Sequence, residues 1–168
     1  KWMSLSYARK AQLLVDMLKI FGTVDHEEWA RESLAAQGFD TIKPETSVAT
    51  EMILNTRSIG KDLETLIDVY CTLRDTGQPP VVSIRTESCM IADVFPRTMP
   101  DRMGPDGDWK VEVWLAEGST GTQNAPPRTT GRLGLLLAAG NQGILAFHDA
   151  FYLLFIENMA TVVKHNPV

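Results

Sequence analysis

The chain has 168 residues, of which 44% are hydrophobic and 22% charged, with 12 Gly, 9 Pro and 2 Cys. This composition excludes a disordered or collagen-like chain and predicts one globular domain that buries roughly 70% of the surface its unfolded chain exposes. Sixteen Lys and Arg against twenty-one Asp and Glu give a net charge of -5. Because the basic residues are also scattered, we expect neither a nucleic-acid surface nor a surface for anionic membranes.

The cysteines and the apolar runs bear on the compartment. Cys71 and Cys89 are too few and too far apart for a disulfide framework or a zinc site, which favours a reducing, cytoplasmic compartment. The apolar runs at 135–139 and 150–156 are much shorter than the roughly 20 residues of a membrane span, so no membrane partner is expected. The sequence begins at Lys1 without a signal pattern and ends soon after an apolar run, so we expect it to be a portion of a longer chain.

The first 80 residues have the periodicity of helices. Apolar residues spaced three and four apart predict an amphipathic helix over 4–21. Asp25, followed three residues later by Glu28, resembles a capping box and predicts a short helix that ends at Gly38. A long helix with one core-facing stripe is predicted to open at Lys43-Pro44-Glu45 and to run up to Thr76-Gly77. The stripe consists of Val48, Met52, Ile59, Leu63, Leu66, Tyr70 and Leu73. Residues 1–80 are therefore predicted to form an N-terminal helical region.

Residues 81–130 change to the alternating pattern of half-buried strands. The apolar positions alternate with polar ones around 82–84, 90–94 and 111–115, which predicts antiparallel strands. The Pro- and Gly-rich stretch 96–108 is predicted to be a loop, and 117–130 a linker.

Residues 131–168 predict one βαβ unit. The continuous apolar run 133–139 is typical of a strand buried on both faces. Residues 145–158 are predicted to form a helix, and 160–163 a second buried strand that ends at Lys164. The predicted fold class is therefore α/β: N-terminal helices and antiparallel strands, then the first βαβ unit of a parallel cofactor-binding sheet. Two strands and one helix leave apolar surface bare, so further strands must come from additional sequence or from a partner chain.

Two polar residues follow the two strands of this unit. Ligands of parallel sheets bind beyond the carboxyl ends of the strands, where Asn141 lies in a Gly-rich turn and Lys164 ends the second strand. The Asn141 amide could donate a hydrogen bond to a developing oxyanion, and the Lys164 ammonium could bind a nucleotide ribose or phosphate. The alternatives are that Asn141 only serves the turn and that Lys164 is a surface lysine.

The segment from Gly134 to Asn141, with that from Glu157 to Lys164, resembles the first βαβ unit of the aldehyde dehydrogenase superfamily. There, Pro-Trp-Asn-Phe-Pro is followed at the same interval by Lys-Pro-x-Glu. The amino-acid sequences of 139–141, 111–115 and 164–168 are similar to those of a divergent bacterial and algal branch of that family. The opening helices look like the family's amino-terminal helical region, and the strands at 81–94 and 111–115 like its strands for subunit contact.

The resemblance implies that the chain is the N-terminal part of an enzyme that oxidises a small-molecule aldehyde to an acid through a thiohemiacetal, with NAD or NADP as cofactor and as a homo-oligomer. Asn141 would stabilise the oxyanion. Lys164 would contact the adenine ribose, with Ala139 and Gly140 also at the cofactor.

The chain departs from the family pattern at several positions. Ala139-Gly140 replaces the usual Pro-Trp, and Pro167 stands where the family has an acidic residue that shares the ribose. The family's nucleophilic Cys and general-base Glu belong to sequence beyond residue 168, and neither Cys71 nor Cys89 has a matching context. The resemblance therefore implies that this chain alone does not carry out the reaction.

Alternatives remain for function and for the histidines. The chain could be a noncatalytic assembly module or degenerate family member, or part of an acyl-CoA-reducing relative. His26, His148 and His165 lack the spacing of metal ligands, so no metal is expected. His148 follows Asn141 on the predicted helix and could line a pocket, although a hydrogen-bonded, partly buried histidine is the more common outcome.

Overall fold

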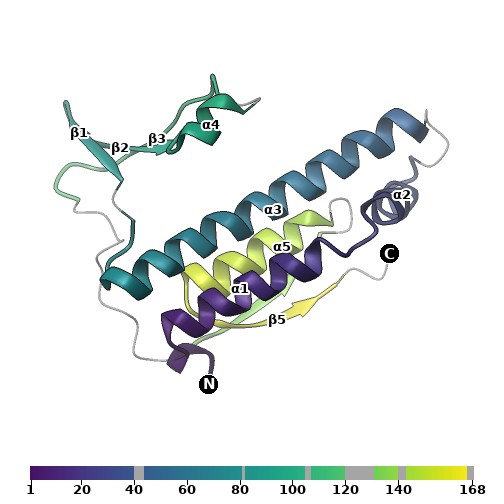
Figure 1. Ribbon diagram of the computed structural model, residues 1–168, viewed down its shortest axis with the longest axis horizontal. Coiled ribbons are helices and arrows are strands. Elements are labelled where there is room, and N and C mark those ends of the chain that lie inside the picture. Colours follow the sequence, from purple (N-terminus) through teal and green to yellow (C-terminus); the bar gives the residue numbers. More distant parts are fainter. Residues whose placement is uncertain (40–43, 81, 105–106, 120–130, 140–142, 166–168) are drawn as a thin grey trace. The chain divides into compact units, whose positions relative to one another are not determined.

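A computed structural model describes residues 1–39, 44–80, 82–104, 107–119, 131–139 and 143–165 (Figure 1). The chain forms two compact units, one from Lys1–Asp75 with Arg128–Val168 and the other from Thr76–Pro127. Helices, a small antiparallel sheet and a two-stranded parallel sheet are all present, as the predicted α/β class requires. The helices at the start of the chain and the βαβ unit at its end thus belong to the same unit.

Three helices open the first unit after a short 3-10 turn, η1 (Trp2–Ser4). Helix α1 (Tyr7–Phe21) begins later than predicted because the Ser6 side chain caps it, accepting a hydrogen bond from the Arg9 backbone N–H. Helix α2 (His26–Ala36) is capped by Asp25, whose carboxylate accepts from the backbone N–H groups of residues 27 and 28. Helix α3 (Pro44–Thr76) begins and ends within the predicted boundary segments.

The core of the first unit lies between α1, α3 and the C-terminal helix. The predicted stripe of α3 is buried or half-buried along its whole length. From Ile59 onward it packs in one cluster with Leu14 of α1, whereas its first residues, Val48 and Met52, pack against α2. Within the same cluster, the Tyr70 hydroxyl donates a 2.7 Å hydrogen bond to the Phe155 carbonyl. The buried cluster consists of Ala11, Leu14, Ile59, Leu63, Leu66, Tyr70, Phe151 and Phe155.

The βαβ unit is present as predicted. Strand β4 (Leu133–Leu137) is followed by α5 (Ile144–Phe151), by a π-helical turn η2 (Tyr152–Ile156) and by β5 (Ala160–Lys164). The strands are parallel, with Leu133 opposite Ala160 and Leu137 opposite Lys164. The helix ends before residue 158, where Asn158 adopts a left-handed backbone conformation with φ of 53°.

The predictions that β4 is buried on both faces and that β5 is a buried strand are wrong, since Val162 and Val163 of β5 are exposed. Leu136 is 4% exposed, whereas Leu133, Leu135 and Leu137 are 70%, 67% and 69% exposed. Successive strand residues point to opposite faces, and only the face toward α5 and η2 is covered. The other face of the parallel pair is an apolar surface without a covering layer among the described residues.

The second unit is an antiparallel sheet in the order β1 (Ser83–Thr86), β2 (Met90–Phe95) and β3 (Val111–Trp114). The predicted loop at 96–108 contains a short helix, α4 (Met99–Met103). The Asp101 carboxylate holds its start by accepting from the backbone N–H groups of residues 97 and 98. In β2 the side chain of Ile91 is fully buried. It lies on the face opposite Met90, Ala92 and Val94, the apolar residues whose alternation predicted the strand.

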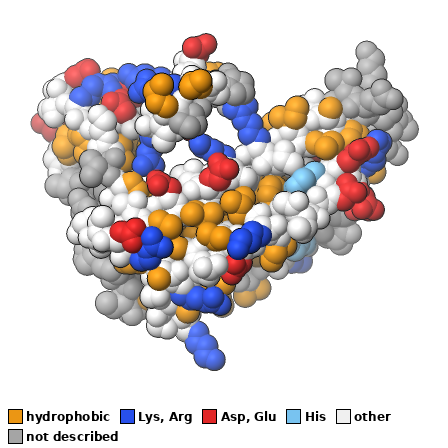
Figure 2. Space-filling model, in the orientation of Figure 1, with side chains coloured by type: hydrophobic (Ala, Val, Ile, Leu, Met, Phe, Trp, Pro, Cys, Tyr) orange, Lys and Arg blue, Asp and Glu red, His pale blue; other side chains and the backbone are white. Residues whose placement is uncertain are grey.

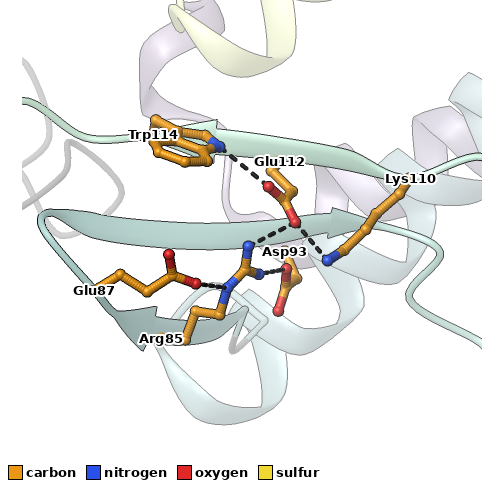
Figure 3. A network of polar contacts seen from close by, with 6 residues as sticks. All are labelled: Arg85, Glu87, Asp93, Lys110, Glu112 and Trp114. Carbon is orange, nitrogen blue, oxygen red and sulfur yellow. Dashed lines mark hydrogen bonds and ion pairs between the residues drawn. The ribbon is translucent and has the colours of Figure 1, made fainter.

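Charged side chains link the three strands on one face of this sheet (Figure 3). Arg85 on β1 contacts Asp93 on β2 and lies 2.6 Å from Glu112 on β3, which also accepts from Lys110 at 2.5 Å. The hydrogen bonds from Lys110 and Arg85 lower the pKa of Glu112 to about 2. This network therefore depends on Glu112 remaining ionised.

Every helix among the described residues is too short or too polar to cross a membrane.

Candidate functional site

A cleft of about 260 Å³ lies in the first unit at the carboxyl ends of the parallel strands. Its walls come from four places in the sequence: α2 with Trp29 and Glu32, the residues after β4, the start of α5 at Gly143, and His165 after β5. Parallel α/β sheets bind ligands at this edge, so the cleft is where the sequence analysis expected a site.

Three of the predicted site residues, Ala139, Gly140 and Asn141, lie between β4 and α5 in the sequence. Gly140 and Asn141 lie outside the described residues, so the roles predicted for them stay predictions. Ala139 and Gly143, on either side of this stretch, both line the cleft. A Cβ added at Gly143 would lie 4.0 Å from Nε1 of Trp29, so α2 passes close to the start of α5.

Lys164 ends β5, and its carbonyl accepts a 2.9 Å hydrogen bond from the Ala138 backbone N–H. Its side chain is exposed and shares the uncovered face of the sheet with Leu137, the residue opposite it. His165 is the next residue and lines the cleft. Lys164, the residue predicted to contact the cofactor ribose, and the cleft thus lie on different sides of the carboxyl edge of the sheet.

The cleft was not predicted as a meeting of α2 with the strand ends. From the sequence, α2 is predicted only as a short capped helix, and His165 is only one of three histidines that lack the spacing of metal ligands. The alternation along β5 is the sequence signal that could have placed His165 and Lys164 on opposite faces, because adjacent strand residues point to opposite faces.

The polar side chains of the cleft divide into two groups. The Ser33 hydroxyl donates to Oε1 of Glu51 at 2.8 Å and so joins α2 to α3, while Gln37 Nε2, at the end of α2, donates to Ser33 Oγ at 3.2 Å. Within the described part of the chain, the Glu32 carboxylate and the His165 imidazole make no hydrogen bond or ion pair. These two groups are available to a ligand.

His148 lies outside the cleft. Its Nδ1 is 2.5 Å from Oδ2 of Asp62 on α3, and the pair borders a separate depression of about 200 Å³. The structure therefore supports the interpretation of His148 as a hydrogen-bonded, partly buried histidine. Across the described ranges, no three His, Cys, Asp or Glu residues come together as metal ligands, and Cys71 and Cys89 are free thiols.

An apolar groove of about 260 Å³ adjoins the far side of Trp29. It is lined by hydrophobic side chains of α1, α2, α3 and α5, and Figure 2 shows hydrophobic side chains gathered along the helices. Phe147 of α5 packs against the Trp29 ring at 5.9 Å, so the indole forms a wall between this groove and the cleft.

No family model, curated protein or solved structure matches the chain. The family to which the sequence was assigned by resemblance therefore stays a prediction.

Proposed function

We propose that the chain is the N-terminal part of an NAD(P)-dependent aldehyde dehydrogenase-like oxidoreductase. The supporting observation is the parallel β4–α5–β5 unit, which has Lys164 on one side of its carboxyl edge and an open cleft on the other. Hydride transfer requires an aldehyde-derived carbon and a nicotinamide to meet at one point. An edge that is open on two sides suits that requirement.

Each predicted site residue has a chemical role in this proposal. The Lys164 ammonium donates hydrogen bonds to ribose hydroxyls, and the Asn141 amide donates to the oxyanion that forms when a thiolate adds to the aldehyde. Ala139 and Gly140 have small or absent side chains, so a nucleotide can approach the backbone closely.

The remaining chemistry is assigned to groups outside these 168 residues. A Cys thiolate would form the thiohemiacetal, and a Glu carboxylate would activate the water that hydrolyses the thioester. NAD or NADP would accept the hydride when bound.

Nucleotide binding by the chain tests the proposal. NADH and NADPH are titrated against the wild type, Lys164→Ala and Lys19→Ala, the last being an exposed lysine of α1. A hydrogen bond to a charged group contributes about 1.5–3 kcal/mol, so we expect Lys164→Ala to weaken binding by about tenfold or more and Lys19→Ala to have no effect. The absence of binding, or equal behaviour of the two variants, would contradict the proposal.

A second candidate, a noncatalytic assembly module, is favoured by the uncovered face of the parallel sheet. Leu133, Leu135, Leu137 and Val162 lie there, and each is more than half exposed. Burial of such a side chain contributes about 1.5–3 kcal/mol, which is enough in sum to support association. Sedimentation analysis separates the candidates, because a chain that associates strongly and binds neither nucleotide fits the assembly module and not the oxidoreductase.

A further inference from the structure

We propose that the cleft beside α2 receives the aldehyde substrate and that Glu32 selects aldehydes that carry an amino group as its ammonium. This inference rests on the proposed function, which it extends from an unspecified aldehyde to a cationic one. It arises from the placement of the cleft and from the charges on its walls.

The position of the cleft keeps it free for the substrate when the cofactor is bound at Lys164. Lys164, the residue proposed to hold the cofactor, lies on the uncovered face of the sheet with Leu137. The cleft is on the other side of the strand edge, between α2 and the start of α5. A cofactor bound at Lys164 therefore leaves this cleft open, and the chain on either side of Asn141 lines it through Ala139 and Gly143.

The charge of the cleft favours a cation. Among the described residues that line it, Glu32 carries a carboxylate and none is Lys or Arg. The Glu32 carboxylate has no ion-pair partner within the described part of the chain. An ammonium group on the ligand would supply the missing partner, whereas a carboxylate on the ligand would be repelled.

The other walls fit a small ligand with an alkyl chain. Trp29 offers an aromatic ring, whose face attracts ammonium groups, and Ala36, Ala139 and Ala146 occupy little space. The volume of about 260 Å³ is just under the range of roughly 300–1,000 Å³ typical of drug-sized ligands, so a short amino aldehyde is the matching size.

Three probes of equal length and different charge test the inference on this chain. Butylammonium, butan-1-ol and butyrate are titrated while tryptophan fluorescence is followed, and Trp29→Phe identifies the signal of the cleft. We expect saturable binding of butylammonium, weaker binding of butan-1-ol and no binding of butyrate. Equal binding of butylammonium and butyrate would overturn the inference.

Two glutamates of α2 provide a matched pair of variants. Glu28 lies on α2 four residues before Glu32 but does not line the cleft. An exposed ion pair is worth up to about fivefold in affinity, so Glu32→Gln should weaken butylammonium binding by about that factor and Glu28→Gln should not change it. Unchanged binding in Glu32→Gln, with the circular dichroism of the wild type retained, would overturn the inference.

Titration of NADH on the same samples separates this inference from the proposed function. If NADH binds through Lys164 and the cleft shows no preference for a cation, the inference alone fails. If the cleft prefers butylammonium and NADH does not bind, the proposed function fails and the substrate role of the cleft fails with it.

Discussion

The hydroxyl of Tyr70 offers a direct measure of how α3 and the βαβ unit stabilise each other. Tyr70 is 4% exposed, and its hydroxyl donates to the Phe155 carbonyl, 85 residues away in the sequence. Its ring also packs edge-on against Phe155 at 5.7 Å, a contact that phenylalanine can keep. The variant Tyr70→Phe therefore removes one oxygen atom and leaves a buried carbonyl without its partner.

The expected loss of stability follows from that geometry. A buried polar group left without a hydrogen bond costs about 1–3 kcal/mol, so we expect Tyr70→Phe to lower the free energy of unfolding by about 2 kcal/mol at neutral pH. Tyr152→Phe is the matched control, because its hydroxyl donates to Oε1 of Glu157 from a side chain that is 53% exposed. We expect that variant to change the free energy of unfolding by less than about 0.5 kcal/mol.

The pH dependence gives a second, independent readout. Burial, and to a smaller extent the neighbouring Tyr7, raises the pKa of Tyr70 to about 12 from an ordinary value of 10.0. Between these values the folded chain keeps a proton that the unfolded chain loses, so the stability present below pH 10 declines as the pH rises toward 12. At 1.36 kcal/mol for each pKa unit, the decline is about 3 kcal/mol, and Tyr70→Phe should lack it.

Urea unfolding followed by circular dichroism, together with the tyrosinate absorbance of the folded chain, measures both effects. The reasoning would be refuted if Tyr70→Phe unfolded at the same urea concentration as Tyr152→Phe. It would equally be refuted if the tyrosinate absorbance of the two variants rose over the same pH range.

Two further predictions concern charged groups. The pKa of Glu112 is lowered to about 2 from 4.5, so its carboxylate stabilises the antiparallel sheet fully above pH 4.5 and loses this effect as the pH falls toward 2. We expect the sheet of Glu112→Gln to be less stable than that of the wild type at neutral pH and to lack this acid transition. Tryptophan fluorescence during an acid titration measures both. Lys10 is buried, its pKa is lowered by that burial, and its ammonium donates to Oδ1 of Asn158 at 2.6 Å. Because the unfolded chain then binds more protons just below pH 10.5, wild-type stability should gain from this lysine as the pH rises toward 10.5, and urea unfolding of Lys10→Met should show a smaller rise over that range.

Local signals in the sequence predicted the elements well, because they act within a few residues. Asp25 caps α2 by accepting from two nearby backbone N–H groups, and Pro44 begins α3, both as predicted. The helix α4 was missed although Thr98 and Asp101 have the spacing of a capping box, because the surrounding prolines and glycines favoured a loop.

The candidate site was predicted only in part, because a cleft is made by elements distant in sequence. The sequence indicated the strand ends at Ala139 and Lys164 through the general rule for parallel sheets. It could not indicate that α2 would bring Trp29 and Glu32 to that edge, since no periodicity within α2 specifies its neighbour in space. His165 was likewise not predicted to line the cleft, because the cleft depends on how α2 packs against the strand ends.

One glycine carries the information about which face of β4 is covered. Gly134 lies on the same face as Leu136, and a Cβ added there would meet Leu153 Cδ1 at 3.0 Å, because η2 packs closely on the strand. A glycine inside an apolar strand is typical of such a close approach, whereas the leucines alone are compatible with burial on either face. Gly134 therefore assigns one face to α5 and η2 and leaves the other, with Leu135 and Lys164, uncovered. The separation of the cleft from Lys164 depends on this assignment, and so does the proposal that substrate and cofactor approach from different sides.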